Sequence, residues 1–164
     1  MAELELVRPM KITLLNILGL RLICAAFSQQ QSNEDQVRST VRSFYADFNS
    51  HGWAHAVNYT TEDWIHINPL GGWTRGRDAV LKELEQVHST FLNGVADTIQ
   101  NMAVKFASPE VAVATVTSQM STFTTPDGTK HENEQHIRTF ILVRRNDRWM
   151  IMQDQNTAVA RPKA

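Results

Sequence analysis

The sequence predicts an α+β domain in which N-terminal helices pack on a curved, mainly antiparallel sheet. Two observations predict this class. In residues 32–48 and 77–91 the apolar positions recur at three- and four-residue spacings, as in helices. After Gly94 the spacing becomes two, as in strands. The long strands should curl around the helices and leave a cavity open at one end. A chain of 164 residues suffices for one domain with a core.

Three helical segments are expected before the main run of strands. The first begins at a capping residue, Ser32 or Asn33, with acidic residues following in the first turn, where the helix dipole favours them. A short helical piece over 53–59 and a helix over 77–91 follow. A strand at 63–68 separates these last two segments.

The second half of the chain has the pattern of a meander. Pro126-Asp127-Gly128 predicts a hairpin turn, because proline and glycine supply the backbone angles that tight turns require. Further turns are expected near 108–110 and 146–147. The predicted strands cover 99–106, 111–123, 129–145 and 149–157.

Residues 1–28 have the layout of a secretory signal. A basic residue, Lys11, precedes an apolar run, and small residues close it at Ala26-Phe27-Ser28. We therefore expect a signal peptide at 1–28, one domain over 29–164, and a periplasmic or secreted protein, or a cytoplasmic one if the leader is retained. An amphipathic N-terminal helix remains the alternative, and translation starts at Met1 or Met10.

The leader also contains the single cysteine of the chain, so the mature domain should contain no disulfide and no thiolate. The apolar run is too short and interrupted to span a bilayer, and no stable membrane anchor is expected once the leader is removed. The net charge is −1, and no block of lysine and arginine forms a stripe. Nucleic acid is therefore not an expected partner.

The strand at 63–68 is the strongest candidate for a pocket wall. Side chains two apart on a strand point the same way, so Trp64, His66 and Asn68 should share one face. His66 is the candidate general base, since imidazole exchanges protons near neutrality. Asn68 is placed to orient a substrate carbonyl or a water. The alternative is that both residues only satisfy buried backbone groups.

The last strand supplies a second set of candidates. Strict alternation predicts one face with Trp149, Ile151, Gln153 and Gln155, and another with Met150, Met152, Asp154 and Asn156. Among methionines, Asp154 should have a raised pKa and act as an acid if it is buried. Gln155 is a candidate ligand-binding residue on the opposite face.

Three residues outside these two strands are further candidates. Arg138, on the neighbouring strand, should pair with Asp154 or hold an anionic ligand. His88, on the buried side of the third helix, either assists catalysis or is a hydrogen-bonded core residue. Trp73 either closes the rim of a pocket, stacking on a planar ligand, or packs in the core.

No metal site and no cofactor are expected. His51 and His55 are four apart, which suits two imidazoles on one ion, but no third ligand lies nearby in the sequence. His131 and His136 are five apart, so on one strand they should face opposite sides. No glycine loop of the phosphate-binding type is present.

Three segments carry a resemblance to a known superfamily, namely Phe44-Tyr45-Ala46-Asp47-Phe48-Asn49, Asn68 through Arg77, and Arg148-Trp149 leading to Gln155-Asn156-Thr157. They resemble the nuclear transport factor 2-like superfamily, and within it the SnoaL-like families, with the SgcJ/EcaC group closest. The resemblance covers about residues 33–157 and implies a cystatin-like cone of curved sheet closed by helices. It also implies a homodimer, because the exposed sheet face of this superfamily usually pairs.

The resemblance also excludes one mechanism. In the ketosteroid isomerase branch, the base is an aspartate directly before a proline, and Asn68 occupies that position before Pro69. An amide cannot accept a proton at neutral pH. The Asp-Arg-Asp set of the limonene epoxide hydrolase branch cannot be located either.

These observations predict a protein that binds a small hydrophobic or aromatic molecule in its cone. They leave open whether it is an enzyme. As an enzyme it would perform cofactor-independent acid/base chemistry such as isomerisation, dehydration or hydrolysis, with His66 as base and Asp154 or His88 assisting. The alternative is a non-enzymatic ligand carrier or a dimerisation module.

Overall fold

The computed structural model describes residues 10–159, with side chains from residue 29 onward. The chain divides into two compact units, Met1–Asp35 and Gln36–Ala164. Of the expected leader, residues 1–9 lie outside the described part, and residues 10–28 are described as backbone only. Among the described residues, no helix combines the length and apolarity needed to cross a membrane.

The first helix, α1, runs without a break over Met10–Ser50. The predicted start at Ser32 or Asn33 is therefore wrong. Asn33 does not cap a helix but accepts a hydrogen bond from Gln29 one turn earlier, at 3.4 Å, and Gln31 donates to Asp35 at 3.2 Å. Such pairs four residues apart support a continuous helix, so the polar segment extends the helix instead of starting it.

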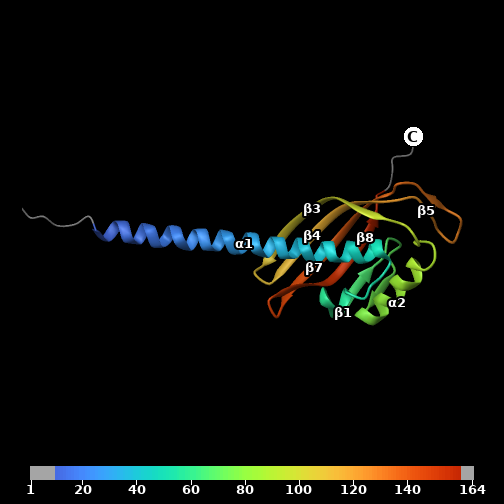
Figure 1. Cartoon of the computed structure of the whole chain (residues 1–164), viewed down its shortest axis with the longest axis horizontal. Helices are drawn as coiled ribbons and strands as arrows, with labels where there is room; N and C mark the ends of the chain where they lie inside the picture. The colour runs from blue at the N-terminus through green and yellow to red at the C-terminus, as the bar shows by residue number, and fades with distance from the viewer. Residues whose placement is uncertain (1–9, 160–164) are drawn as a thin grey trace, which may run out of the picture. The chain divides into compact units, whose positions relative to one another are not determined.

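The second unit forms the α+β fold that the sequence predicts (Figure 1). Its main sheet has six strands in the order β2-β1-β8-β7-β4-β3, and β5 pairs with β6 in a separate ribbon. Neighbouring strands are antiparallel, except that β1 and β8 are parallel. The elements after α1 are η1 (Ala56–Asn58), β1 (Thr60–Ile67), β2 (Trp73–Arg75), α2 (Arg77–His88), β3 (Asp97–Ser108), β4 (Val111–Met120), β5 (Phe123–Thr124), β6 (Lys130–His131), β7 (Gln135–Arg145) and β8 (Arg148–Ala158).

Two strand predictions differ from the structure near the hairpin turn. The strand expected over 111–123 ends at Met120, and the strand expected over 129–145 is split into β6 and β7. The split falls at a turn in which Asn133 has a left-handed backbone, with φ of 45°. Asparagine tolerates this region better than most residues, so the turn interrupts a pattern that otherwise alternates. The three-residue β2 was not predicted.

Aromatic side chains fill the centre of the second unit, between α1 and the sheet. Phe44, on α1, lies 5.2 Å from Phe140 on β7 and 5.4 Å from Trp53, measured between ring centroids. It also meets Tyr45 and Trp64 edge-on. All five residues are buried. The predicted apolar stripe of the helix therefore does pack against the inner face of the sheet.

A bulge in β8 changes which of its residues face inward. Ile151 pairs with Leu142 and Gln153 pairs with Ile141, so Met152 is an extra residue without an opposite partner. An extra residue shifts the alternation of side chains by one position.

The faces predicted for the last strand are therefore wrong beyond Met152. Asp154 and Asn156 are buried on the inner face with Trp149 and Ile151. Gln153 and Gln155 lie on the outer face, Gln155 being exposed.

We predict that Phe44→Ala lowers the free energy of unfolding by about 3–5 kcal/mol, because it removes the ring around which four other aromatic residues pack. Urea denaturation of the full chain measures this. Val57→Ala is the matched control. Val57 is 54% exposed, so its loss should change stability by no more than about 0.5 kcal/mol. Equal effects for the two variants would contradict the assignment of Phe44 to the core.

Candidate functional site

The inner face of the sheet changes from apolar to polar toward one end. On β7 the buried residues change from Leu142 and Phe140 to Arg138 and His136, β8 changes in the same way, and β4 contributes the buried Ser118. Strand pairing brings these polar residues to the same end of the sheet, as in the pairs Ser118–His136 and Arg138–Asn156. We call this region the polar end. It comprises His66, Asp97, Ser118, His136, Arg138, Asp154 and Asn156, all buried.

Asp154 is the centre of the polar end and is fully buried, with 0% exposure. Its Oδ1 accepts a hydrogen bond from Trp64 Nε1 at 2.9 Å. His66 Nδ1 lies 3.1 Å and 3.0 Å from the two carboxylate oxygens. Arg138 Nη1 donates to Oδ2 at 3.0 Å. The structure thus brings together four of the residues that the sequence singled out.

The pKa of Asp154 is lowered, whereas the sequence predicted a raised value. Burial alone would raise it, but the charge and hydrogen bond of His66, the charge of Arg138 and the hydrogen bond from Trp64 outweigh burial. The expectation of a raised pKa is therefore wrong, because it counted burial and not the partners. An ionised carboxylate cannot donate a proton, so here Asp154 is an acceptor.

The ionised carboxylate fixes the orientation of His66. A carboxylate only accepts hydrogen bonds, so His66 Nδ1 carries the proton that faces it. In the neutral ring the other nitrogen, Nε2, is then the proton acceptor. Nε2 has no hydrogen-bond partner among the described residues. His66 is thus buried on the face shared with Trp64, as predicted.

Asn68 does not join this cluster. Its Oδ1 accepts hydrogen bonds from the backbone N–H groups of Leu70 at 3.1 Å and Gly72 at 2.9 Å. Its Nδ2 donates to Glu83 Oε1 on α2 at 3.2 Å. A Cβ added at Gly72 would lie 2.3 Å from that same Nδ2. The amide therefore holds the turn between β1 and β2 and ties it to α2.

Two other predicted ligand-binding residues also lie apart from Asp154. Trp73, on β2, is 58% exposed, and the guanidinium of Arg75 lies over its ring at 4.2 Å from the centroid. Gln155 lies on the outer face of β8, opposite to Asp154. Neither residue is brought to the polar end.

His88 closes α2 and packs in an aromatic corner. Its ring lies edge-on to Phe48, at 4.4 Å between centroids, and to Trp53, at 5.3 Å. Its Nδ1 is 2.7 Å from Nδ1 of His51, so one of the two rings donates and the other accepts. Burial, followed by the charges of His51 and Arg138, lowers the pKa of His88 to about 4. Its Nε2 is buried without a partner among the described residues.

Sequence reasoning missed Asp97, Tyr45 and Ser118. The Tyr45 hydroxyl donates to Ser118 Oγ at 3.4 Å. Burial raises the pKa of Tyr45 to about 12, with Arg138 lowering it and Asp97 raising it. Asp97 was missed because the strand was expected to begin at 99, which left this inward position in a loop. The available signal was the alternation of inward positions, which extends backwards from Ile99 to Asp97.

Histidines that the sequence weighed as metal ligands have other partners. His51 contacts His88, and His55 lies 3.2 Å from Asp47. His131 and His136 do not face opposite sides, because they belong to different strands, and both contact the carboxylate of Glu134. Within residues 29–159, whose side chains the structure describes, no three acidic, histidine or cysteine side chains gather as a metal-binding group.

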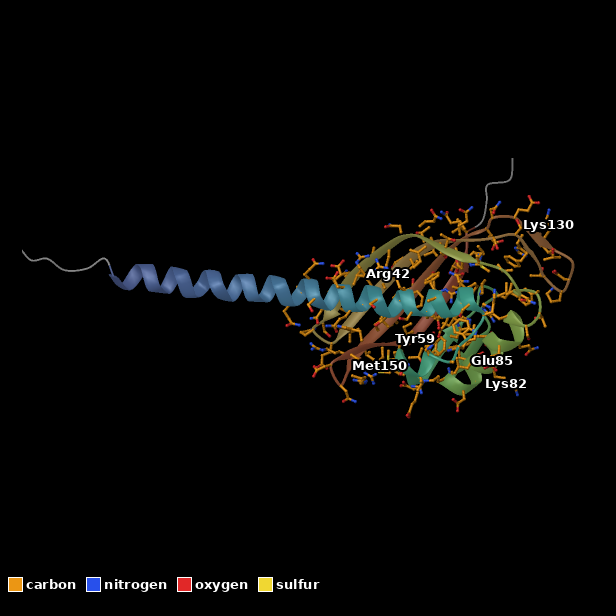
Figure 2. The ribbon with its side chains drawn as sticks, viewed as in Figure 1. Arg42, Tyr59, Lys82, Glu85, Lys130 and Met150 are labelled. Atoms are coloured by element: carbon orange, nitrogen blue, oxygen red, sulfur yellow. The ribbon has the colours of Figure 1, made fainter. Side chains whose placement is uncertain are left out.

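Two surface hollows lie away from the polar end. One, of about 450 Å³, lies between α1, the segment around Tyr59 (labelled in Figure 2) and the start of β8. Its Tyr59 donates a hydrogen bond to Asp47 Oδ2 at 2.8 Å. The other, of about 470 Å³, lies at the N-terminus of α2, beside Arg75 and Arg77. Neither is lined by residues of the polar end.

A comparison with protein families identifies the class to which this protein belongs. A model of the SnoaL-like domain family matches residues 41–150, more than half of the chain, so this chain belongs to the SnoaL-like family. Its fold is the cystatin-like, nuclear transport factor 2-like fold that the sequence predicted. A search of curated proteins finds no match.

Solved structures of the same fold share little sequence with this chain. An uncharacterised protein with a cystatin-like fold from Caulobacter vibrioides superposes with a TM-score of 0.74 at 20% identity, covering 77% of this chain and 89% of that one. A putative scytalone dehydratase from Novosphingobium aromaticivorans gives 0.65 at 14% identity, covering 82% and 89%. A type 2 hexachlorocyclohexane dehydrochlorinase gives 0.68 at 10% identity, covering 80% and 88%.

We predict that stability falls as the pH is lowered from about 6.5 to about 4, in part because of His88. Its ordinary pKa is 6.5 and its folded value is about 4, so in this window the unfolded chain binds a proton that the folded chain excludes. The loss from this residue reaches roughly 3 kcal/mol, since one pKa unit corresponds to about 1.4 kcal/mol.

Urea denaturation of the wild type and of His88→Gln at several pH values measures this. The variant should lose less stability across the window, because glutamine does not titrate. The control is His55→Gln, at a side chain that is 77% exposed, which should keep the wild-type dependence. Identical pH profiles for wild type and His88→Gln would contradict the assignment.

Proposed function

We propose that the polar end binds a small, largely apolar molecule and that His66 acts there as the general base of a cofactor-independent elimination. The observation that carries this proposal is the contact of His66 Nδ1 with the buried, ionised Asp154. That contact leaves Nε2 of the neutral ring as the proton acceptor, in a buried region where the ring of Trp64 lies 6.5 Å from that of His66 between centroids. The polar end needs no metal or cofactor to move a proton.

The steps of the proposed elimination follow from the charges of His66 and Asp154. When His66 Nε2 takes a proton from a C–H bond, the electron pair of that bond forms a C=C double bond and the leaving group departs with its own pair. The new imidazolium faces the carboxylate of Asp154, which stabilises it. If the leaving group is hydroxide, His66 returns the proton and water forms. If it is chloride, the proton is lost later to solvent.

Arg138 limits how strongly Asp154 can stabilise the imidazolium. The guanidinium donates to the same carboxylate at 3.0 Å, so the carboxylate charge is shared between two cations once His66 is protonated. Arg138 and Trp64 are therefore proposed as positioning residues, which keep Asp154 ionised and in place.

The comparisons support elimination in particular. Structures of the same fold include putative dehydratases and a dehydrochlorinase, names that denote loss of water and of hydrogen chloride. At 10–14% identity these likenesses show the fold alone. They supply a reaction class to test.

We predict that His66→Asn lowers the rate of elimination at least about 100-fold, the usual contribution of a general base. Chloride release from hexachlorocyclohexane and water loss from scytalone are the two assays. Trp64 and Arg138 still donate to Asp154 in this variant, so the protein should stay folded. His55→Asn, an exposed histidine, is the matched control and should keep wild-type rates.

The alternative is a ligand carrier without catalysis. Neither substrate would then turn over in the wild-type protein, and His66→Asn would change affinity only. If His66 is purely structural, its replacement would lower the melting temperature and change neither turnover nor affinity.

We also propose a homodimer formed through the outer face of the sheet. Outward positions on β1, β8, β7 and β4 lie side by side across the strands, as in the pairs Ile65–Gln153, Gln153–Ile141 and Ile141–Val113. A broad uncharged area of this kind is what a paired sheet face requires. Its residues are Ile65, Ile67, Val113, Thr115, Thr117, Ile137, Thr139, Ile141, Gln153, Gln155 and Thr157.

We predict that the wild type sediments as a dimer at micromolar concentration and that Ile137→Arg sediments as a monomer. Ile137 is 41% exposed within this face, and an arginine there would bury an unpaired charge in the interface. Val57→Arg, at a more exposed apolar residue on η1, should remain a dimer. A monomeric mass for the wild-type protein would contradict the proposed dimer.

A further inference from the structure

A second buried carboxylate in the polar end lacks any partner. Asp97, at the start of β3, is 1% exposed, and neither of its carboxylate oxygens has a hydrogen-bond partner among the described residues. This contrasts with Asp154, whose oxygens accept four contacts. A buried polar group without hydrogen bonds is costly, so a partner from elsewhere is expected at Asp97.

The backbone of Asp97 is held firmly while its side chain is left free. Asn49, near the end of α1, accepts a hydrogen bond from Asp97 N at 2.7 Å and donates to Asp97 O at 3.0 Å. Helix and strand are thus locked together at this residue. The carboxylate is therefore held in place before any ligand binds, and such preorganisation is common in binding sites.

Asp97 belongs to the same polar end as the proposed base. Asp97 pairs with Met120 on β4, two residues after Ser118, to which the Tyr45 hydroxyl donates. The charges of Asp97 and Asp154 both raise the pKa of Tyr45, and Arg138 lowers it. Asp97 is on β3 and Asp154 on β8, with β7 and β4 between them in the sheet. The two carboxylates therefore flank the polar end from opposite sides.

A second residue of the polar end also has an unpaired atom. Arg138 Nε is buried without a hydrogen-bond partner among the described residues. Unsatisfied buried polar atoms are uncommon in a native protein, so two residues with such atoms in one region indicate that a polar partner is missing there.

We infer that Asp97 is the binding residue for a hydroxyl group of the ligand, so that the substrate class is a small ring compound that carries a hydroxyl. This inference rests on the proposed function, since it assigns the ligand of the same polar end. The hydroxyl donates to the Asp97 carboxylate while the apolar ring lies among the aromatic side chains. A hydroxyl recognised in this way discriminates strongly against analogues that lack the donor.

The test uses phenol and anisole as probes, because they differ in the hydroxyl proton and share the ring. Each is titrated into the full-length wild-type protein and into Asp97→Asn, with affinity and backbone amide shifts measured by NMR. We expect phenol to bind the wild type at least about tenfold more tightly than anisole, with amide shifts at Asp97 and Ser118. Asp97→Asn should lose that preference and keep its weak affinity for anisole.

The control is Asp63→Asn, the same change at an exposed aspartate of β1, which should bind both probes as the wild type does. Equal binding of phenol and anisole to the wild type, or an unchanged preference in Asp97→Asn, would overturn the inference and assign the unpaired carboxylate to an enclosed water. The elimination assays on His66→Asn would remain unaffected by that result. Failure of both probes to bind would overturn the inference and the proposed ligand site together.

Discussion

The rest of this structure depends on one buried carboxylate. Asp154 lies in the interior of the cone and is stable there only because three residues on two other strands donate to it. These contacts link β1, β7 and β8 at the polar end. Each partner also depends on the others, because the loss of Arg138 would leave an unbalanced charge and the loss of Asp154 would leave a buried guanidinium. A polar interior of this kind is maintained as a unit or not at all.

The remainder of the cone supplies the apolar half of the arrangement. Phe44 packs beneath the polar end, with the Arg138 guanidinium 4.8 Å from its ring centroid. The same aromatic residue thus supports the core and contacts the charged cluster. Buried polar atoms with no partner in the described chain occur at both ends of the strands, at Asp97 and Arg138 of the polar end and at Arg144 and Trp149 of the other end. Those of the polar end belong to the proposed site, where local departures from full hydrogen bonding are typical of function.

Much of the fold followed from periodicity, and much of the site did not. The change of spacing after Gly94 was sufficient for the α+β class, and the face shared by Trp64 and His66 followed from alternation alone. The inward position of Asp154 could not be predicted from alternation, because a bulge leaves no signature in a run such as Met150-Ile151-Met152. Its lowered pKa depended on partners distant in sequence. Asp97 was missed because strand ends are the least certain part of any pattern.

The bulge in β8 has a consequence for how this chain tolerates change in length. Met152 adds one residue to the middle of a strand, and regular pairing resumes with Gln153 opposite Ile141. Deleting Met152 would therefore remove the bulge and leave Gln153 and Gln155 outward and the carboxylate inward. Deleting a paired residue further along the strand would instead exchange the two sets of side chains beyond it. A relative of this chain without the extra residue would carry its inward acidic group one place nearer to the position of Ile151, so alignments that ignore the gap would match the wrong residues.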